Sequence, residues 1–319
     1  MHESRRSKLS IVGAGAVGSS AAYAALIRGS AHDIAIHDID APRARAEMLD
    51  LRHGTQFTDS SRMLDDVSLD GTAESDVVVI TAGAKQKPGQ SRMDLVATNA
   101  RMMESMVPAL VERSPDAVYV VVSNPCDVLA TVAQQISALP AERVLASGTV
   151  LDTSRLRVLI AAEAGVAPSS VHATIAGEHG DSEVALWSSA SIGSVPILDW
   201  SGVGSPFTLA RLHELAESVR TAAYEVIQGK GATNYAIGLS VARIVEAILA
   251  DQRVVLPVSR VQSGAYGVSG VAVSLPHLVG RSGATPVLGL PMSVDERTAL
   301  SASAAAIAGA LRSVGYQPS

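Results

Sequence analysis

Hydrophobic and polar positions follow two rhythms in the first half of the chain. Short apolar runs of strand length occupy residues 9–12, 33–36, 76–81 and 117–122. The last two runs are rich in β-branched residues, as in strands that are buried on both faces. Longer segments that suit helices occupy residues 17–28, 42–53 and 93–113. Because strands alternate with helices, the pattern predicts an α/β fold with a doubly wound parallel sheet.

The second half has a less regular pattern. Helical segments occupy residues 153–164, 206–228, 234–249 and 294–313. Shorter strand-like runs occupy residues 171–175 and 253–258, and a segment rich in Gly and Ser over residues 263–274 predicts hairpins and turns. We therefore expect two domains, with the parallel sheet in residues 1–147 and a C-terminal α+β domain in residues 148–319.

Composition excludes several classes of protein. Hydrophobic residues make up 47% of the 319 residues, which is ample material for a core. The net charge of −6 argues against a nucleic-acid-binding protein, which would need a basic face. Residues 1–10 lack the apolar core of a secretory signal, and no uncharged apolar stretch in the sequence is long enough to cross a membrane. We expect a cytoplasmic protein with neither nucleic-acid nor membrane partners.

Cys126 is the only cysteine in the sequence, so no intrachain disulfide can form. This usage suits a reducing compartment. No neighbour in the sequence would lower the pKa of its thiol, and we interpret Cys126 as a small buried hydrophobe rather than a nucleophile. No histidine pattern accompanies it, and we expect no metal site.

A glycine-rich turn follows the first predicted strand and opens the first predicted helix. Its sequence, Gly13-Ala14-Gly15-Ala16-Val17-Gly18, has the form G-x-G-x-x-G. The first glycine permits a tight turn, the second lets a pyrophosphate approach the backbone, and the third lets the helix pack closely on the strand. The helix N-terminus would then face the phosphate charge. The motif and its context predict a Rossmann-type dinucleotide-binding domain over residues 1–147.

Asp38 stands at the end of the second predicted strand, 20 residues after Gly18. A carboxylate at this place would accept a hydrogen bond from a ribose 2′-hydroxyl and repel a 2′-phosphate, which predicts NAD rather than NADP. A solvated turn acid is the alternative interpretation, since Asp40 is close by.

Residue types that suit the oxidation of a secondary alcohol occur further along the chain. The reaction needs a base for the hydroxyl proton and its reverse needs an acid, and His179, in a loop after a predicted strand, can serve as both. Asp152 could hold the other ring nitrogen and raise the basicity of the imidazole. Arg155 could hold a substrate carboxylate, and Arg92, in a polar lid-like loop, could polarise a carbonyl. Taken one at a time, each could equally be a core or surface residue.

These residues lie in motifs that are specific in combination. The motifs are L-D-T-S-R at 151–155, G-E-H-G-D-S at 177–182, S-N-P at 123–125, and the segments 81–92 and 230–237. With them the chain resembles the L-lactate/malate dehydrogenase family over nearly its whole length. The resemblance implies that His179 donates and accepts the proton with Asp152 as its partner, that Arg155 binds the substrate carboxylate, and that Arg92 polarises the carbonyl. It also implies that Asn124 helps to orient the substrate and the nicotinamide.

The resemblance further implies NAD as the cofactor and a set of residues that bind it. Ile237 would be an apolar contact of the nicotinamide ring, which favours the neutral reduced form in a dry site. The expected cofactor contacts are Gly13, Gly15, Val17, Gly18, Asp38, Thr81, Gly83, Asn99, Ser123, Asn124 and Ile237.

Two positions select the substrate within this family. Gln86 occupies the lid position at which malate enzymes carry an arginine for the second carboxylate, and Thr233 matches a second position of the lactate type. Oxaloacetate would bring an unpaired negative charge into the closed site. Lys85 and Lys87 flank Gln86 but lack the planar fork of arginine, and we interpret them as solvated lid charges. We therefore expect pyruvate and L-lactate as substrates, in a reaction of anaerobic glycolysis.

Arg157 and His172 match positions that bind fructose 1,6-bisphosphate in many bacterial members of the family, at a two-fold subunit interface. Positive charges from two subunits would repel there, and a bisphosphate would neutralise them and favour one quaternary state. The resemblance also implies a homotetramer. The alternative interpretation is a helix-surface arginine and a strand histidine with no ligand.

Three other classes of protein fit parts of this pattern. A malate dehydrogenase ranks second, and Gln86 and Thr233 argue against it. An NAD-using glycosidase of a related Rossmann-type family would need metal-binding Cys and His residues that the sequence does not provide. A non-catalytic protein derived from such an enzyme would be expected to lose at least one of the catalytic candidates, and all of them are present.

Overall fold

Six parallel strands form the greater part of an eight-stranded sheet. The computed structural model describes residues 6–58, 61–84, 92–201 and 206–318. Within these ranges, it describes only the backbone of residues 92–94. The parallel strands are β1 (Lys8–Val12), β2 (Asp33–His37), β3 (Arg62–Met63), β4 (Val77–Ile80), β5 (Val118–Val121) and β6 (Val144–Ala146). They pair in the order β6-β5-β4-β1-β2-β3. This is the strand order of a doubly wound Rossmann sheet, so the predicted fold class is confirmed.

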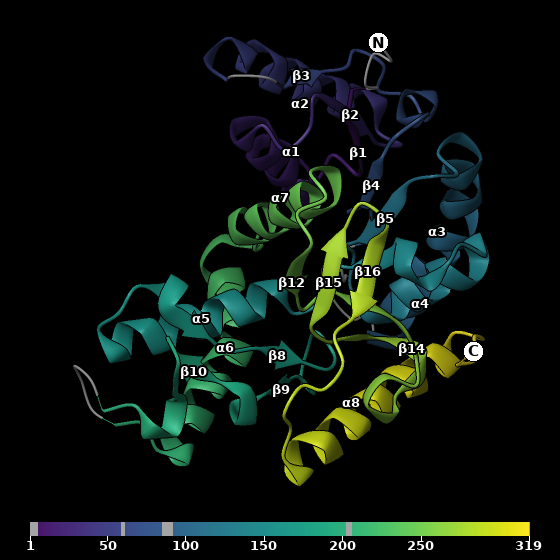
Figure 1. Ribbon diagram of the computed structural model, residues 1–319. Coiled ribbons are helices and arrows are strands. Elements are labelled where there is room, and N and C mark those ends of the chain that lie inside the picture. Colours follow the sequence, from purple (N-terminus) through teal and green to yellow (C-terminus); the bar gives the residue numbers. More distant parts are fainter. Residues whose placement is uncertain (1–5, 59–60, 85–91, 202–205, 319) are drawn as a thin grey trace, which may run out of the picture.

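Helices cover both faces of this sheet, which explains the continuous apolar sequence of its strands. The described chain contains the helices α1 (Ala16–Arg28), α2 (Ala41–His53), α3 (Arg92–Arg113), α4 (Cys126–Ser137), α5 (Val150–Ala164), α6 (Leu209–Lys230), α7 (Tyr235–Leu249) and α8 (Val294–Ser313). All of them except α5 and α6 pack mainly on the sheet. In β4, Val77 and Val79 pack on the face covered by α1, α2 and α7, whereas Val78 and Ile80 pack on the face covered by α3, α4 and α8. Figure 1 shows α1 and α7 on one side of β4 and β5, and α3 and α4 on the other.

Strands from the second half extend the sheet and form smaller ones. They are β7 (Val171–His172), β8 (Ile175–Ala176), β9 (Val184–Ala185), β10 (Ser191–Ile192), β11 (Val195–Pro196), β12 (Val254–Leu256), β13 (Ser259–Ser263), β14 (Ser269–Ser274), β15 (His277–Gly280) and β16 (Gly283–Pro286). β13 pairs antiparallel with β6, and β14 pairs antiparallel with β13. The Gly- and Ser-rich segment over residues 263–274 lies in this hairpin, as predicted.

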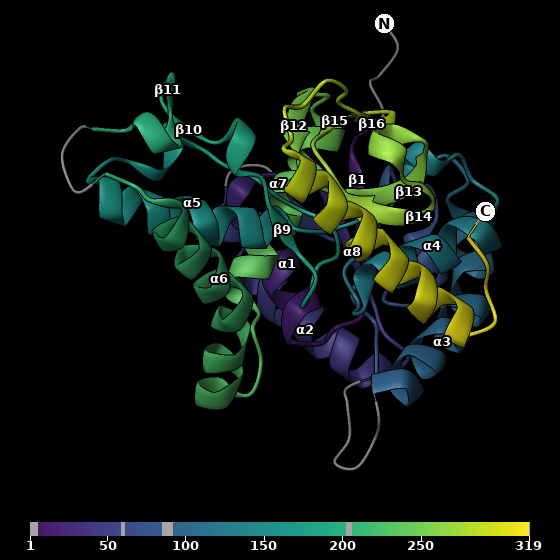
Figure 2. The same ribbon diagram turned by 90° about the horizontal axis from the view of Figure 1, so that it is seen from below.

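The two halves of the chain share their packing. Gly238 of α7 approaches α1 so closely that a Cβ would lie 2.8 Å from the Ser20 carbonyl group. Asn234 Nδ2, just before α7, donates a hydrogen bond to Ser20 Oγ at 2.9 Å. α8 begins with a capping box between Ser293 and Glu296, and it crosses α4 and β14 (Figure 2). The domain boundary near residue 147 therefore stays a prediction.

A separate apolar core lies in the second half. Leu156 and Ile160 of α5 pack there with Leu212 and Leu215 of α6, together with side chains from β7 and β10. Figure 1 shows α5 and α6 beside β8, β9 and β10, away from the parallel sheet. This core packs one face of α5, and α5 supplies two of the candidate site residues, Asp152 and Arg155.

Several elements differ from the sequence prediction, among them the three features that follow. The hydrophobic pattern did not single out α4 or β6, which complete the sheet and its helical cover. The strand predicted over residues 171–175 is divided into β7 and β8, because β7 pairs with β10 whereas β8 pairs with β9. α5 begins at Val150, before the predicted start at residue 153, and this brings Asp152 into its first turn.

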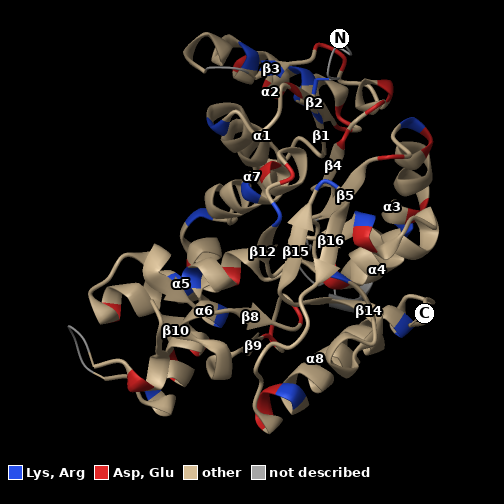
Figure 3. Cartoon of the chain, in the orientation of Figure 1, with Lys and Arg blue, Asp and Glu red and all other residues tan. Residues whose placement is uncertain are grey.

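Charged residues of both signs lie along the helices in Figure 3, whereas β15 and β16 carry none. Among the helices that the structure describes, none combines the length and the apolar character that crossing a membrane requires.

Candidate active site

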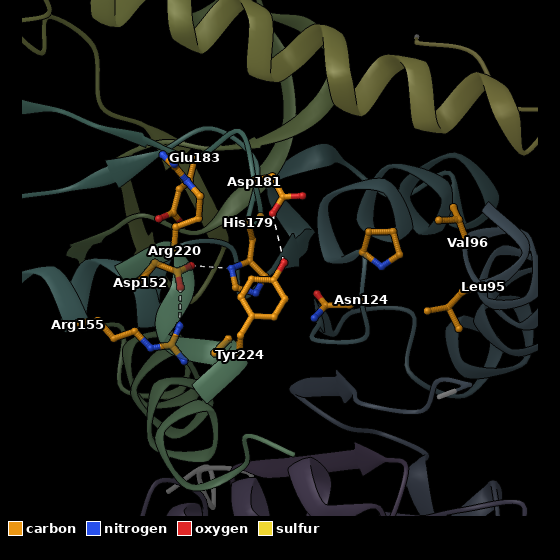
Figure 4. Close-up of a pocket in the computed structure, with 13 residues that line it drawn as sticks. Leu95, Val96, Asn124, Asp152, Arg155, His179, Asp181, Glu183, Arg220 and Tyr224 are labelled. Carbon is orange, nitrogen blue, oxygen red and sulfur yellow. Dashed lines mark hydrogen bonds and ion pairs between the residues drawn. The ribbon is translucent and has the colours of Figure 1, made fainter. Parts of the chain in front are cut away.

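Asp152, Arg155 and His179 line one cavity of about 320 Å³ (Figure 4). Asp152 and Arg155 lie in the first part of α5, and His179 lies in the loop between β8 and β9. Asp152 Oδ2 is 2.6 Å from His179 Nδ1, and Asp152 Oδ1 accepts a hydrogen bond from Arg155 Nη1 at 2.8 Å. The carboxylate therefore holds both side chains, and it leaves His179 Nε2 as the ring nitrogen available to a substrate.

The buried carboxylate controls the charge of this cavity. Burial by itself would raise the pKa of Asp152, whose side chain is 3% exposed, but His179 and Arg155 lower that pKa below its ordinary value. Burial disfavours the charged form of His179 as well, and this would lower its pKa. The Asp152 carboxylate outweighs this effect and raises the pKa of His179 to about 9. His179 is therefore a cation at neutral pH and holds a proton beside the cavity.

A second buried carboxylate, which the sequence analysis missed, fixes the backbone of His179. Asp127 lies in the first turn of α4, and its Oδ2 accepts a hydrogen bond from the His179 backbone N–H at 2.8 Å. Burial raises the pKa of Asp127 to about 6. The preceding Cys126 is 1% exposed, and burial raises the pKa of its thiol well above the ordinary value. This agrees with the prediction of a buried hydrophobe rather than a nucleophile.

Asn124 lines the same cavity and follows β5. Asn99 Nδ2 donates a hydrogen bond to the Asn124 carbonyl oxygen at 2.9 Å, and Asn99 Oδ1 accepts one from the Ala84 backbone N–H at 2.8 Å. Ser123 Oγ donates to the Ala82 carbonyl oxygen at 2.5 Å. These predicted residues tie together the segments after β4 and β5, at the carboxyl edge where a doubly wound sheet binds its ligand.

The glycine loop after β1 has the shape of a phosphate cradle. Gly13 has a φ of +109°, and a Cβ there would lie 2.6 Å from the Ala82 backbone nitrogen. A Cβ at Gly18 would lie 1.8 Å from the Gly13 carbonyl oxygen, so close packing requires this glycine. At Gly15 a Cβ would meet no described atom within 4 Å. This open space in front of α1 fits the pyrophosphate of a dinucleotide.

Asp38 lies just beyond β2 and reaches back to the glycine loop. Its Oδ2 accepts a hydrogen bond from the Ala14 backbone N–H at 2.7 Å. The side chain of the neighbouring Asp40 instead caps α2, and the Asp40 backbone N–H donates a hydrogen bond to Asp38 Oδ1 at 2.9 Å. Thr81 Oγ1 donates to the Gly13 carbonyl oxygen at 2.9 Å. The described residues around the loop therefore fit an NAD site in which Asp38 stands where the ribose would bind.

Several predicted residues lie away from the catalytic cavity or outside the described part of the chain. Gln86, with the flanking lysines, lies outside the described residues, and Arg92 begins α3 with a side chain that is not described. Val17 is half-buried in α1, Gly83 is exposed after β4, Thr233 lies between α6 and α7, and Ile237 is half-buried in α7. These last four are not among the described residues that line the catalytic cavity.

One of the two predicted effector residues, Arg157, is hydrogen-bonded to the backbone next to the other, His172. Arg157 is half-buried in α5, and its Nε donates a hydrogen bond to the Ala173 carbonyl oxygen at 2.9 Å. His172, the residue before Ala173, is exposed in β7. The structure therefore places the Arg157 side chain beside the end of the strand that carries His172.

Four further polar residues that the sequence analysis did not assign line the cavity. Arg220 and Tyr224 lie one turn apart on α6, and the Tyr224 hydroxyl donates to Asp181 Oδ1 at 3.5 Å. Glu183 is buried beside Asp152 and Arg220 (Figure 4). Asp181 belongs to the G-E-H-G-D-S motif and Glu183 directly follows it, so their position offered a signal. The residues of α6 carry no local motif.

The chain is similar to L-lactate dehydrogenases over nearly its whole length. It is 49% identical to the L-lactate dehydrogenase of Synechococcus sp. (strain JA-3-3Ab) over 297 residues, which are 93% of this chain and 96% of that protein. It is 47% identical to the L-lactate dehydrogenase of Bifidobacterium animalis subsp. lactis (strain AD011), over 93% of each chain. Its structure has a TM-score of 0.92 to a minor L-lactate dehydrogenase from Enterococcus mundtii, which is 38% identical, over 97% of this chain and 98% of that chain.

Both halves of the chain also match one family. Residues 7–146 match the family described as lactate/malate dehydrogenase, NAD binding domain. Residues 149–314 match the family described as lactate/malate dehydrogenase, alpha/beta C-terminal domain. The first match contains the glycine loop and Asp38, and the second contains Asp152, Arg155 and His179. The chain therefore belongs to the lactate/malate dehydrogenase family.

Proposed function

We propose that this chain is an NAD-dependent L-lactate dehydrogenase, which reduces pyruvate to L-lactate with NADH and also catalyses the reverse reaction. The observation that carries the proposal is the single cavity in which Asp152 holds His179 at 2.6 Å and Arg155 at 2.8 Å. A 2-oxo acid needs a cation for its carboxylate and a proton donor for its carbonyl oxygen, and this cavity offers both. The single cysteine supports a cytoplasmic location.

His179 acts as both acid and base in this proposal. NADH, when bound in the glycine loop beside Asp38, supplies the hydride. As the carbonyl oxygen gains negative charge, His179 Nε2 donates its proton to that oxygen, and the Asp152 carboxylate keeps the imidazole oriented for the transfer. In the reverse direction the neutral imidazole accepts the hydroxyl proton. Arg155 holds the substrate carboxylate, so that the carbonyl stays in one orientation.

The choice of pyruvate over oxaloacetate rests on the sequence. We assign Gln86 and Thr233 to the pocket for the substrate methyl group, Arg92 to the carbonyl oxygen, and Asn124 to substrate and nicotinamide orientation. Gln86 offers no positive charge to a second carboxylate, and an unpaired charge in a closed site is costly. The proposal also divides the chain into a cofactor domain over residues 1–147 and a substrate domain over residues 148–319.

The proposal includes a homotetramer and an effector site for fructose 1,6-bisphosphate at Arg157 and His172. The effector site is supported by the hydrogen bond that Arg157 donates to the Ala173 carbonyl oxygen, next to the exposed His172. The positive charges of two subunits would repel each other across a two-fold axis, and a bound bisphosphate would neutralise them.

The test is NADH oxidation by the purified protein with pyruvate and, separately, with oxaloacetate. We expect kcat/KM to be about 100-fold higher for pyruvate. A preference for oxaloacetate would overturn the lactate assignment and leave the hydride chemistry in place. Fructose 1,6-bisphosphate should lower the pyruvate KM, and an unchanged KM with unchanged assembly would remove the effector site from the proposal.

A further inference from the structure

Glu183 is a buried carboxyl group in the wall of the catalytic cavity, and the reaction described above gives it no role. It follows His179 by four residues, and its backbone N–H donates to the Gly180 carbonyl oxygen at 3.2 Å. The residue is 8% exposed, and its Oε1 has no hydrogen-bond partner among the described residues. A buried oxygen without a partner is uncommon and calls for an explanation.

Glu183 also borders a second cavity behind the same wall. Together with Arg220 it lines both the catalytic cavity and a neighbouring cavity of about 620 Å³. Figure 4 shows Glu183 and Arg220 on the side of the catalytic cavity that carries Asp152. Titratable and charged side chains from α5, the His179 loop, α6 and α8 line the two cavities that Glu183 borders. They are Asp152, Arg155, His179, Asp181, His213, Glu217, Arg220, Asp295 and Glu296.

We propose that Glu183 is a positioning residue for the proton on His179. Its carboxyl group is uncharged while the enzyme reduces pyruvate near neutral pH, and its ionisation at higher pH keeps the His179 imidazolium protonated. Glu183 thereby extends pyruvate reduction to more alkaline solutions. The inference rests on the proposed role of His179 as proton donor.

The two states of Glu183 act differently on His179. A protonated carboxyl adds no charge to a cavity that already contains the Asp152 carboxylate. An ionised carboxylate adds a second negative charge near the imidazole, which favours the protonated ring. Burial and the Asp152 carboxylate raise the pKa of Glu183 to about 8, whereas the pKa of His179 is about 9. As the pH rises, Glu183 therefore loses its proton first and delays the loss of the proton from His179.

The alkaline limb of pyruvate reduction tests this inference. kcat/KM for pyruvate at saturating NADH is measured across the alkaline range for the unmodified protein, Glu183→Gln and Glu163→Gln. The amide of Glu183→Gln matches the uncharged carboxyl in shape but cannot ionise. Glu163 lies on α5, like Asp152, and pairs with Arg211 at 2.9 Å. Its variant is the matched control, because it removes a carboxylate that does not line the catalytic cavity.

We expect the midpoint of the alkaline limb to fall by about one pH unit in Glu183→Gln and to stay in place in Glu163→Gln. Glu183→Asp keeps an ionisable group and should restore part of the shift. Equal midpoints in the unmodified protein and Glu183→Gln would overturn the inference. A different result would contradict the proposed function, namely a His179→Asn variant that reduces pyruvate as fast as the unmodified protein.

NMR titration of the His179 ring gives a second readout that does not need activity. The resonance is identified by its absence from His179→Asn, and its midpoint should fall in Glu183→Gln. We expect this variant to fold, because the raised pKa of Glu183 makes the unmodified protein lose stability as the pH rises from 4.5 through about 8. The amide avoids that loss. A His179 midpoint that is unchanged in Glu183→Gln would overturn the inference.

Discussion

The glycine loop and the catalytic cavity are built in opposite ways. The loop places Gly13, Gly15 and Gly18 in one short segment, and its shape follows from where a Cβ fits and where it does not. The cavity collects Asp152 from α5 and His179 from a distant loop, and its properties follow from burial and charge. The first site is local in sequence, whereas the second exists only after the chain has folded.

The difference predicts how each site responds to substitution. In the loop, the effect of a substitution depends on the space available to a Cβ at that one backbone position. This space can differ completely between neighbouring positions. In the cavity, one carboxylate with a 3% exposed side chain holds two partners, so that its loss changes every group around it.

Asp152→Asn is expected to have the largest effect, because it removes the charge on which the cavity depends. The amide keeps the shape of the side chain but no longer favours protonated His179, and it leaves Arg155 without its anion. We expect kcat/KM for pyruvate to fall on the order of 10³-fold. Asp65→Asn is the control, since Asp65 lies in an exposed pair with Arg52 and should matter little. A loss smaller than about tenfold in Asp152→Asn would break the contrast between the two sites.

Arg155→Lys is expected to have the next largest effect. Lysine keeps the positive charge but lacks the planar fork that binds a carboxylate through two hydrogen bonds. We expect the pyruvate KM to rise about 100-fold with a smaller change in kcat. The matched control is Arg211→Lys, because Arg211 contacts Glu163 and Glu214 on the surface. Similar small changes in both variants would show that Arg155 does not hold the substrate.

Alanine substitutions in the loop sharpen the comparison at a smaller scale. Gly18→Ala should destabilise the protein by about 1–3 kcal/mol in urea unfolding, because its Cβ would lie 1.8 Å from the Gly13 carbonyl oxygen. Gly15→Ala faces open space, and we expect it to keep normal stability while NADH affinity falls about tenfold. Equal losses of stability in the two variants would contradict the local, steric account of the loop.

Much of the fold could be predicted because its signals are repeated and local. β4 and β5 are continuous apolar runs buried on both faces, and α8 begins at a recognisable capping box. α4 escaped prediction although the polar residues Asp127, Thr131, Gln134 and Gln135 share one face of the helix. β6 has only three residues, too few to show a period.

The site could be predicted where its residues lie in motifs. Asp152 and Arg155 share one motif and His179 lies in another, and the structure places all three in one cavity. Glu183 directly follows the second motif, but its role, like that of Asp127, depends on burial and on the approach of elements that are distant in the chain. An exposed acid and a buried acid look the same in a sequence.

The most direct test of the central claim is the pH dependence of both reaction directions in the unmodified protein. If His179 carries the proton, pyruvate reduction needs the protonated ring, and L-lactate oxidation needs the neutral ring. Because the pKa of His179 is about 9, kcat/KM for pyruvate should fall and kcat/KM for L-lactate should rise as the pH increases through that value. Opposite limbs with a common midpoint are the expected result. Parallel profiles, or no change in either direction across this range, would contradict the assignment of His179 as the acid and base.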